Sequence, residues 1–268
     1  MYEFKITDNE FNSFREFIYD YAGISLSDEK KTLVTSRLSK RLRHYSLKTF
    51  KEYFDLMISS PPSGERQVVV DLLTTNETYF FREPKHFAFL EKEILAKWKG
   101  GKTFRVWSAA SSTGEEAYSI AMLVDDMLEN RPWEIFGSDI SSRVLKKAQQ
   151  AHYLQNRIDG IPIAFLRKYC LQGMGEHEGT LLIDKALRQK VSFAPVNLKQ
   201  PPKNLGPFDV IFLRNVLIYF DMETKRQIIK QIVEKMHPDG YLFIGHSESL
   251  KGIHDGLETV IPTVYRKI

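Results

Sequence analysis

The chain has 268 residues, of which 43% are hydrophobic and 27% are charged, and its formal net charge at pH 7 is +4. These values are typical of a soluble globular protein with one large domain or two smaller ones. No apolar run approaches the ~20 residues that span a bilayer, and the N-terminus has no signal-peptide core. The single cysteine, Cys170, excludes an intrachain disulfide and a cysteine metal cage, so we expect a cytoplasmic protein without membrane insertion.

The first eighty residues predict helices. Thr7 and Glu10 have the spacing of a capping box, and aromatic residues then recur at helical intervals. Ser27 or Asp28 is placed to cap a second helix, and two more helices follow. The Ser- and Pro-rich segment 59–64 between those two predicts a loop.

The second of these helices has a local excess of positive charge. Segment 30–51 contains eight Lys and Arg residues and no Asp or Glu: Lys30, Lys31, Arg37, Lys40, Arg41, Arg43, Lys48 and Lys51. On an otherwise balanced chain, this pattern predicts a basic face for an acidic partner. A plain solvated surface has the same pattern, so the charges alone leave both interpretations open.

Residues 74–83, with the sequence TTNETYFFRE, connect the helical part to the rest of the chain. Several polar residues and three aromatic residues are unusual in a connecting segment. One interpretation is a lid that closes over a ligand. The other is an ordinary interdomain hinge packed by Phe80 and Phe81.

From about residue 100 the pattern changes to strands that alternate with helices. Strands are predicted at 104–108, 133–139, 191–193, 208–213, 240–245 and 259–265, with helices at 115–129 and 222–236 among them. This alternation predicts an α/β fold with a doubly wound parallel sheet. A turn-rich stretch with Gly173, Gly175 and Gly179 interrupts it, so we expect a small antiparallel insert over about residues 170–190.

The loop after the first strand consists of small residues and has one glycine, Gly114. A dinucleotide site typically has three glycines around a pyrophosphate. S-adenosylmethionine carries no phosphate and needs only small side chains where the backbone approaches it, so this loop suits it better. A tight turn without a ligand also uses small residues.

Polar residues follow two of the predicted strands. Asp139 ends the second strand, where ligands of open α/β sheets bind, and its carboxylate suits the two hydroxyls of a ribose. The alternative, a helix cap, falls more naturally to Ser141. Arg214, Asn215 and Tyr219 follow the apolar strand at the same sheet edge, although they also lie where the next helix is capped.

Six segments of the chain together resemble one family. They read TNETYFFRE, RVWSAASSTGEEAYSIAM, FGSDIS, PVNL, FDVIFLRNVLIYF and PDGYLFIGHSE. In this order and spacing they resemble the chemotaxis receptor methyltransferase (CheR) family over nearly the whole chain. The resemblance implies a helical receptor-recognition domain over 1–75, a linker and first catalytic helix over 76–100, and a methyltransferase domain over 101–268 that carries the β-subdomain.

The resemblance also implies roles for individual residues. The positions that correspond to S-adenosylmethionine-binding residues are Asn76, Thr78, Arg82, Ala109, Ala110, Glu116, Asp139, Ile140, Asn197, Leu198, Arg214 and Asn215. Asn197 and Leu198 would flank the adenine, and Tyr219 would lie near the methyl donor. Three positions depart from the commonest family pattern: Ser111, Ala117 and Ser141. We expect these departures to change the affinity for the cofactor more than the activity.

The implied reaction is methyl transfer to a glutamate γ-carboxylate of a chemotaxis receptor. This carboxylate is ionised at neutral pH, its reference pKa being about 4.3, so no general base and no metal are expected. We assign Arg82 and Tyr219 to orienting it. Arg37, Lys40, Arg41 and Arg43 would meet acidic receptor helices, and the hairpin with Gly173 and Gly175 would bind a receptor C-terminal peptide by strand addition. We expect a monomer.

Two rival hypotheses remain. The sequence pI of about 8.9 suits a nucleic-acid methyltransferase, but the segment Arg214–Leu217 lacks the Asn/Asp-Pro-Pro-aromatic pattern of base methylation on nitrogen. Cys170 does not follow a predicted strand of the main sheet, where a cytosine-methylating enzyme would need its nucleophile. A module that senses the cofactor without catalysis is the second rival.

Overall fold

A computed structural model describes residues 4–59, 61–62 and 64–268. The N-terminal helices are α1 (Asp8–Ala22), α2 (Lys31–His44), α3 (Phe50–Ser59) and α4 (Glu65–Leu73), and they bury a core of their own. The predicted capping box is confirmed, because Thr7 Oγ1 accepts a hydrogen bond from Glu10 N (3.3 Å) and Glu10 Oε2 accepts one from Thr7 N (2.8 Å).

The start of the second helix differs from the prediction. A short 3₁₀ turn, Asp28–Lys30, precedes α2, and neither Ser27 nor Asp28 caps the helix with its side chain. Asp28 pairs instead with Arg15 of α1 (2.8 Å). Of the loop predicted at 59–64, Ser59 belongs to α3, and positions 60 and 63 lie outside the described residues.

The main sheet has the strand order β6-β2-β1-β7-β8-β10-β9. Its strands are β1 (Phe104–Ala109), β2 (Trp133–Asp139), β6 (Val191–Pro195), β7 (Phe208–Leu213), β8 (Met236–Ile244), β9 (Leu257–Ile261) and β10 (Val264–Lys267). The first five in spatial order are parallel, and β10 pairs antiparallel with both neighbours. This confirms the α/β class.

The last predicted strand, 259–265, was wrong as a single strand. The chain turns back between β9 and β10 at Pro262 and Thr263. Proline has no N–H for a ladder, and Thr263 has a φ of 67°, in the left-handed region. A hairpin therefore replaces the continuous strand.

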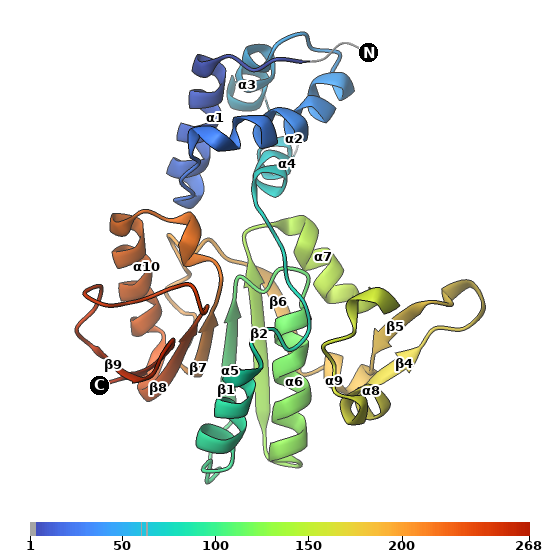
Figure 1. The fold of residues 1–268 in the computed structure, drawn as a ribbon, viewed down its shortest axis with the longest axis vertical. Helices are drawn as coiled ribbons and strands as arrows, with labels where there is room; N and C mark the ends of the chain where they lie inside the picture. The colour runs from blue at the N-terminus through green and yellow to red at the C-terminus, as the bar shows by residue number, and fades with distance from the viewer. Residues whose placement is uncertain (1–3, 60, 63) are drawn as a thin grey trace.

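Helices cover both faces of the sheet (Figure 1). One face packs against α5 (Pro84–Phe89), the π-helical Leu90–Leu95 and α6 (Glu115–Leu128), and the other against α10 (Met222–Glu234). The helix α7 (Ser142–Gln150) follows β2, and the short α8 (Ile163–Tyr169) and α9 (Lys185–Arg188) lie near the insert. No helix within the described ranges is long and apolar enough to cross a bilayer.

The small antiparallel insert is present as a second sheet, β3-β5-β4. Its strands are β3 (His152–Leu154), β4 (Cys170–Gln172) and β5 (Thr180–Ile183). The expected hairpin, β4–β5, lies within residues 170–190, but β3 comes from before that range. A strand of three residues carries too little periodicity to be recognised from sequence.

Candidate functional site

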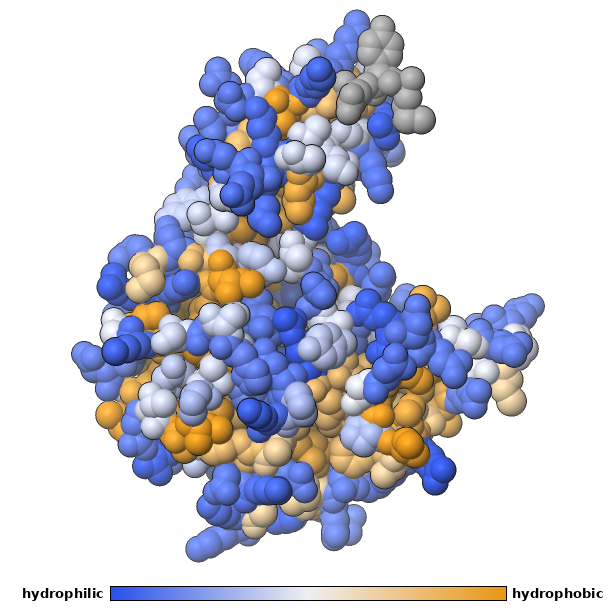
Figure 2. Space-filling model, viewed as in Figure 1, coloured by the Kyte–Doolittle hydropathy of each residue, from blue (hydrophilic) through white to orange (hydrophobic). Residues whose placement is uncertain are grey.

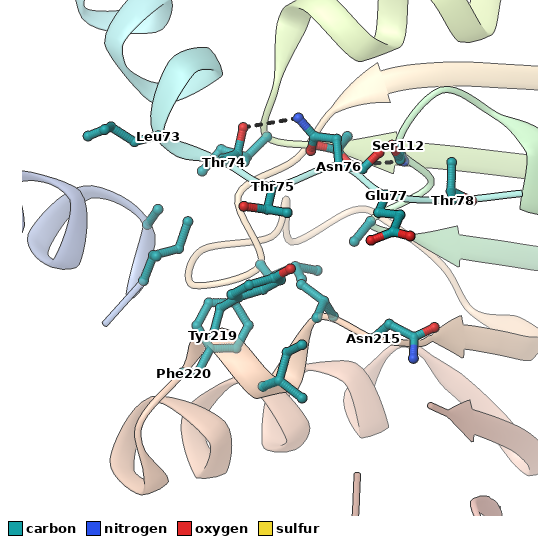
Figure 3. A pocket seen from close by; sticks show the side chains of 18 of the residues that line it. Leu73, Thr74, Thr75, Asn76, Glu77, Thr78, Ser112, Asn215, Tyr219 and Phe220 are labelled. Atoms are coloured by element: carbon teal, nitrogen blue, oxygen red, sulfur yellow. Dashed lines mark hydrogen bonds between the residues drawn. The ribbon is translucent and has the colours of Figure 1, made fainter. Parts of the chain in front are cut away.

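A cavity of about 290 Å³ opens where β1 and β7 lie side by side. The chain runs outward from β1 to β2 and β6 on one side and from β7 to β8 on the other, so this is the point where the strand order reverses. Such switch points are where open α/β sheets bind ligands. The linker 74–83 runs along one side of the cavity, and Tyr219 lies across from it (Figure 3).

Most of the cofactor residues predicted from the sequence meet in this cavity. Those that line it are Asn76, Thr78, Arg82, Ala110, Glu116, Asp139, Ile140, Asn197, Leu198, Arg214, Asn215 and Tyr219. They come from the linker, from the β1–α6 loop and the first turn of α6, from the end of β2 and the residue after it, and from the loops after β6 and β7. Ala109 is different, because it is the last residue of β1 and its side chain packs in the core on the α10 face of the sheet.

Asp139 ends β2 with a carboxylate that the backbone partly satisfies. Its Oδ1 accepts a hydrogen bond from Ser141 N (2.9 Å), and its Oδ2 accepts one from Ser112 N (3.0 Å). Burial nevertheless raises the pKa of Asp139 to about 6. A carboxylate accepts about four hydrogen bonds, so it keeps acceptor sites for two hydroxyls of a ligand. Ser141 occupies the N-cap position of α7 but makes no capping bond with its side chain.

Arg214 is a buried cation at the back of the cavity, with a side chain only 1% exposed. Its Nη1 lies 3.0 Å from Glu116 Oε2, and Glu116 Oε1 accepts a hydrogen bond from Ser108 Oγ (2.7 Å). Burial raises the pKa of Glu116, whereas the positive charge of Arg214 lowers it. Glu116 and Arg214 thus present a paired carboxylate and guanidinium to a polar ligand.

The linker is attached to the β1–α6 region by defined hydrogen bonds. Ser112 Oγ donates to the carbonyl of Asn76 (3.0 Å), and the N–H of Phe81 donates to Ser119 Oγ (2.9 Å). Phe80 is fully buried in the core of the sheet domain. The segment therefore combines both interpretations: its aromatic residues pack as in a hinge, and its polar residues form a wall of the cavity.

Arg82 and Tyr219 face the cavity from opposite elements. The Arg82 guanidinium donates to the Glu77 carbonyl (3.1 Å) and lies over the Tyr79 ring, with its Cζ 5.5 Å from the ring centroid. Burial raises the pKa of Tyr219, and the positive charges of Arg82 and Arg37 act in the opposite direction. A guanidinium and a phenol hydroxyl are suitable donors to a carboxylate.

The helical domain forms a wall of the cavity that the sequence did not predict. Its contribution consists of Ala22, Ile24, Ser25, Leu26, Lys30, Leu33 and Leu73. Ser25 N donates to the carbonyl of Tyr219 (2.8 Å), and Asn197 Nδ2 donates to the carbonyl of Tyr21 (2.6 Å). The Asn197 amide, expected at the adenine, therefore holds the end of α1 as well as lining the cavity. These contacts join segments far apart in sequence, and no local pattern indicates them.

The four basic residues of α2 that were assigned to a partner divide into two pairs. Arg37 Nη1 donates to the carbonyls of Leu72 (3.0 Å) and Thr74 (2.9 Å). Arg41 makes two bonds to the buried Glu65 (2.8 and 2.7 Å). Lys40 and Arg43 are exposed. Two of the four thus serve the helical domain itself.

The hairpin glycines also differ from each other. Gly173 N donates to the carbonyl of Thr180 (2.9 Å), and a Cβ at Gly173 would lie 1.9 Å from the His177 carbonyl oxygen. Gly175 has a φ of +60° and open space where a Cβ would point. Gly173 is therefore required by close packing of the turn, and Gly175 by its backbone conformation.

Glu83, His86 and His246 bring three potential metal-ligand atoms within 4.8 Å of one another. Arg214 lies 3.0 Å from the same Glu83 oxygen that faces the two histidines. A metal ion there would share its carboxylate ligand with a buried guanidinium, so we interpret the group as a hydrogen-bonded ion pair.

Comparison with known proteins identifies the family of this chain. The model described as "CheR methyltransferase, all-alpha domain" matches residues 9–74, and "CheR methyltransferase, SAM binding domain" matches residues 76–265. The chemotaxis protein methyltransferase of Escherichia coli K12 is 42% identical, over 97% of this chain and 91% of that protein. Chemotaxis protein methyltransferase 2 of Pseudomonas aeruginosa is 40% identical, over 98% and 94%. The Borreliella burgdorferi enzyme is 36% identical, over 98% and 95%. The resemblance seen in the sequence is confirmed: the chain belongs to the CheR family of S-adenosylmethionine-dependent methyltransferases.

Proposed function

We propose that this protein transfers a methyl group from S-adenosylmethionine to glutamate side chains on the cytoplasmic domains of chemotaxis receptors. The products are glutamate methyl esters and S-adenosylhomocysteine, and the modification adapts receptor signalling. The observation that carries this proposal is that Arg82 and Tyr219 line the same cavity from different elements. Both side chains can donate hydrogen bonds to a carboxylate. The relatives' description as chemotaxis methyltransferases supports the receptor as acceptor.

The residues around the cavity fit S-adenosylmethionine by their chemistry. Asp139 would accept the ribose hydroxyls, and Ile140 and Leu198 would contact the adenine. Glu116 and Arg214 would meet the charged methionine end, and Asn76 and Thr78 would cover it from the linker. When bound, the cofactor supplies a methyl group on a positively charged sulfur.

The protein's own contribution is to position the acceptor and exclude water. A glutamate carboxylate is already ionised at neutral pH, so it needs no base to become a nucleophile. Arg82 and Tyr219 donate hydrogen bonds that hold this carboxylate in line with the methyl group. The walls from the linker and the helical domain keep the site dry, which favours a reaction in which opposite charges neutralise each other.

Exposed cations of α2 are the proposed contact with the receptor. Lys40 and Arg43 are exposed, and methylated receptor helices are acidic. Surface ion pairs contribute only about 0–1 kcal/mol each, so these residues steer encounter more than they hold the complex. Arg37 serves mainly to fix the end of α4, although its charge also reaches Tyr219.

The three-stranded sheet is the proposed second contact. Its edge strand β4 pairs on one side with β5, so its other side offers backbone groups to an added strand. Strand addition of a receptor C-terminal peptide would use these groups. A tether of this kind gives a millimolar-order effective concentration of the receptor near the active site. Figure 2 shows the molecule hollowed between the helical domain and this sheet, where a receptor helix has room. The protein would act in the cytoplasm as a monomer.

The test is transfer of radiolabelled methyl groups to receptor-containing membranes, with DNA and RNA as competing acceptors. Wild-type protein should label the receptor and not nucleic acid, and Asp139→Ala should lose labelling together with cofactor binding. Labelling of nucleic acid would favour the rival enzyme, and cofactor binding without transfer to any acceptor would favour a sensor.

A further inference from the structure

Glu83 is a largely buried carboxylate that does not line the cavity and that the proposed reaction does not use. It is the last residue of the linker, directly after Arg82, and its side chain is 11% exposed. Its Oε1 accepts hydrogen bonds from Asn215 Nδ2 (3.2 Å) and from His246 N (3.2 Å). Its Oε2 lies 3.0 Å from Arg214 Nη2 and 3.3 Å from Arg214 Nε. Both oxygens are therefore occupied by donors from the loop after β7 and the end of β8.

These donors belong to residues that line the cavity. Arg214 and Asn215 are cavity residues, and Arg214 also donates to the backbone carbonyl of Arg82. One carboxylate thus connects the linker to the loop on the opposite side of the switch point. The connection fixes Arg82 and Asn215 relative to each other across the site.

The backbone of the linker needs such an attachment. Phe81 has a φ of 53° and Glu83 a φ of 60°, both in the left-handed region that non-glycine residues seldom adopt. Conformations of this kind persist only where the surrounding structure imposes them. The hydrogen bonds of Glu83 provide that constraint directly at the end of the segment.

A second carboxylate holds the same loop from its other side. Glu248 Oε2 accepts hydrogen bonds from Asn215 N (3.0 Å) and Gly245 N (2.6 Å), and its Oε1 accepts one from Ile218 N (3.3 Å). The loop 214–219, which ends at Tyr219, is therefore bound through its backbone by Glu248 and through its side chains by Glu83. Glu83 also joins this loop to the linker at the residue after Arg82, beside the hydrogen bond from Arg214 to the Arg82 carbonyl.

We propose that Glu83 is a positioning residue: it locks the linker onto the loop 214–219 and so sets Arg82, Arg214 and Asn215 in the arrangement that binds cofactor and acceptor. This inference rests on the proposed function and adds a residue to it. Glu83 does not line the cavity, and its oxygens face Arg214, Asn215, His86 and His246.

Glu83→Gln is the direct test. An amide has one oxygen and one NH₂ group, so either orientation sets its NH₂ against donors, those of Arg214 or those of Asn215 and His246. We expect affinity for S-adenosylhomocysteine to fall by about tenfold or more, which corresponds to the loss of charge-assisted hydrogen bonds. The single-turnover rate at saturating S-adenosylmethionine should also fall. Glu83→Asp keeps the charge on a side chain that is one methylene shorter, so both quantities should lie between those of Glu83→Gln and those of wild type.

The matched control is Glu65→Gln in the helical domain. Glu65 is also a buried carboxylate, with two bonds from Arg41, so its loss should lower the melting temperature in a similar way. It should leave the affinity for S-adenosylhomocysteine within about twofold of wild type, measured by calorimetry well below the melting temperature.

Two outcomes would overturn the proposal. One is a Glu83→Gln protein that melts at a lower temperature yet keeps wild-type affinity and single-turnover rate. The other, if Glu83→Gln does not fold, is a Glu83→Asp protein with both quantities unchanged. Failure of the proposed function has a different signature, because the wild-type protein itself would then not bind the cofactor or not methylate the receptor.

Discussion

Asp139 combines burial with a backbone that partly satisfies its charge, and the balance between them gives it a pKa of about 6. The carboxylate is 7% exposed and accepts two backbone hydrogen bonds. Because its pKa lies above the usual value of 3.8, this group destabilises the cofactor-free fold increasingly as the pH rises from about 4 to about 6. The proposed contact with the ribose has the opposite preference, since only the ionised form of Asp139 would accept both hydroxyls.

The affinity for S-adenosylhomocysteine should therefore depend on pH. It should be constant above pH 7 and fall as the pH drops through 6, by up to about tenfold per unit, because binding then requires loss of a proton. Calorimetry between pH 5 and 8 measures this change, and Asp139→Asn should bind weakly with no such slope. A wild-type affinity that is flat over this range would show that Asp139 does not hold the ribose in its ionised form.

A second prediction at the residue scale concerns Ser111. Its hydroxyl is buried and finds no hydrogen-bond partner among the described residues, a situation that costs about 1–3 kcal/mol. Ser111→Ala should raise the free energy of unfolding by about 1 kcal/mol in urea titration. The matched control is Ser119→Ala, which removes a buried hydroxyl that bonds Phe81 N and the Glu115 carbonyl and should destabilise. Equal destabilisation by both changes would contradict this account.

The sequence predicts which polar residues lie at the site, but it does not predict where each side chain points. Asp139 and Arg214 were found because they stand at the carboxyl ends of predicted strands, where open α/β sheets bind ligands. Ala109 was predicted in the loop, but it is the last residue of β1, and its side chain packs in the core because the side chains of a strand alternate between faces. Whether such a side chain faces the core or the cavity depends on where the strand ends, and a run of small residues does not indicate that position.

At the scale of elements, the turn between β4 and β5 distinguishes two glycines that look alike in the sequence. Gly173→Ala would put a Cβ against the backbone of His177, so the turn must distort. Gly175→Ala meets nothing and should cost only about 1 kcal/mol for its positive φ. We expect Gly173→Ala, but not Gly175→Ala, to abolish binding of a receptor C-terminal peptide in a fluorescence titration. If both variants still bound the peptide, the hairpin would not be its binding site.

In helix α2, the number of basic residues overestimates the number of cations that are free to contact a partner. Lys40 and Arg43 are exposed, whereas Arg41 neutralises the buried Glu65. The double change Lys40→Glu with Arg43→Glu should slow receptor methylation several-fold at low salt, with the difference shrinking at 0.5 M salt and little change in stability. Initial rates at both salt concentrations measure this.

Arg41→Ala is the control for that experiment. It leaves the carboxylate of Glu65 buried without its partner and should lower the free energy of unfolding by about 3–5 kcal/mol. Unchanged rates in the double variant at low salt would remove α2 from receptor binding. The sequence counts charges correctly, but only the fold shows which of them are already paired.

At the scale of the whole molecule, the helical domain forms part of the cavity wall. Lys199 Nζ donates to the carbonyls of Tyr19 (3.2 Å) and Asp20 (2.8 Å) at the end of α1, and Tyr19 donates to Asp221 (2.7 Å). The helical end is thus held beside both Asn197 and Tyr219. Periodicity and turn residues predicted the two parts separately. Their contact joins positions about 180 residues apart, which no local pattern encodes.

The proposal that this chain makes glutamate methyl esters on a receptor can be tested directly by the release of methanol in base. A receptor cytoplasmic fragment is labelled with S-adenosylmethionine carrying tritium in its methyl group, then treated with mild base, and the released methanol is counted. Carboxyl esters hydrolyse under these conditions, whereas methyl groups on nitrogen do not. Nearly all label should be released as methanol, and a fragment with its methylated glutamates changed to alanine should take up none. Label that resists base, or that persists in the alanine fragment, would contradict it.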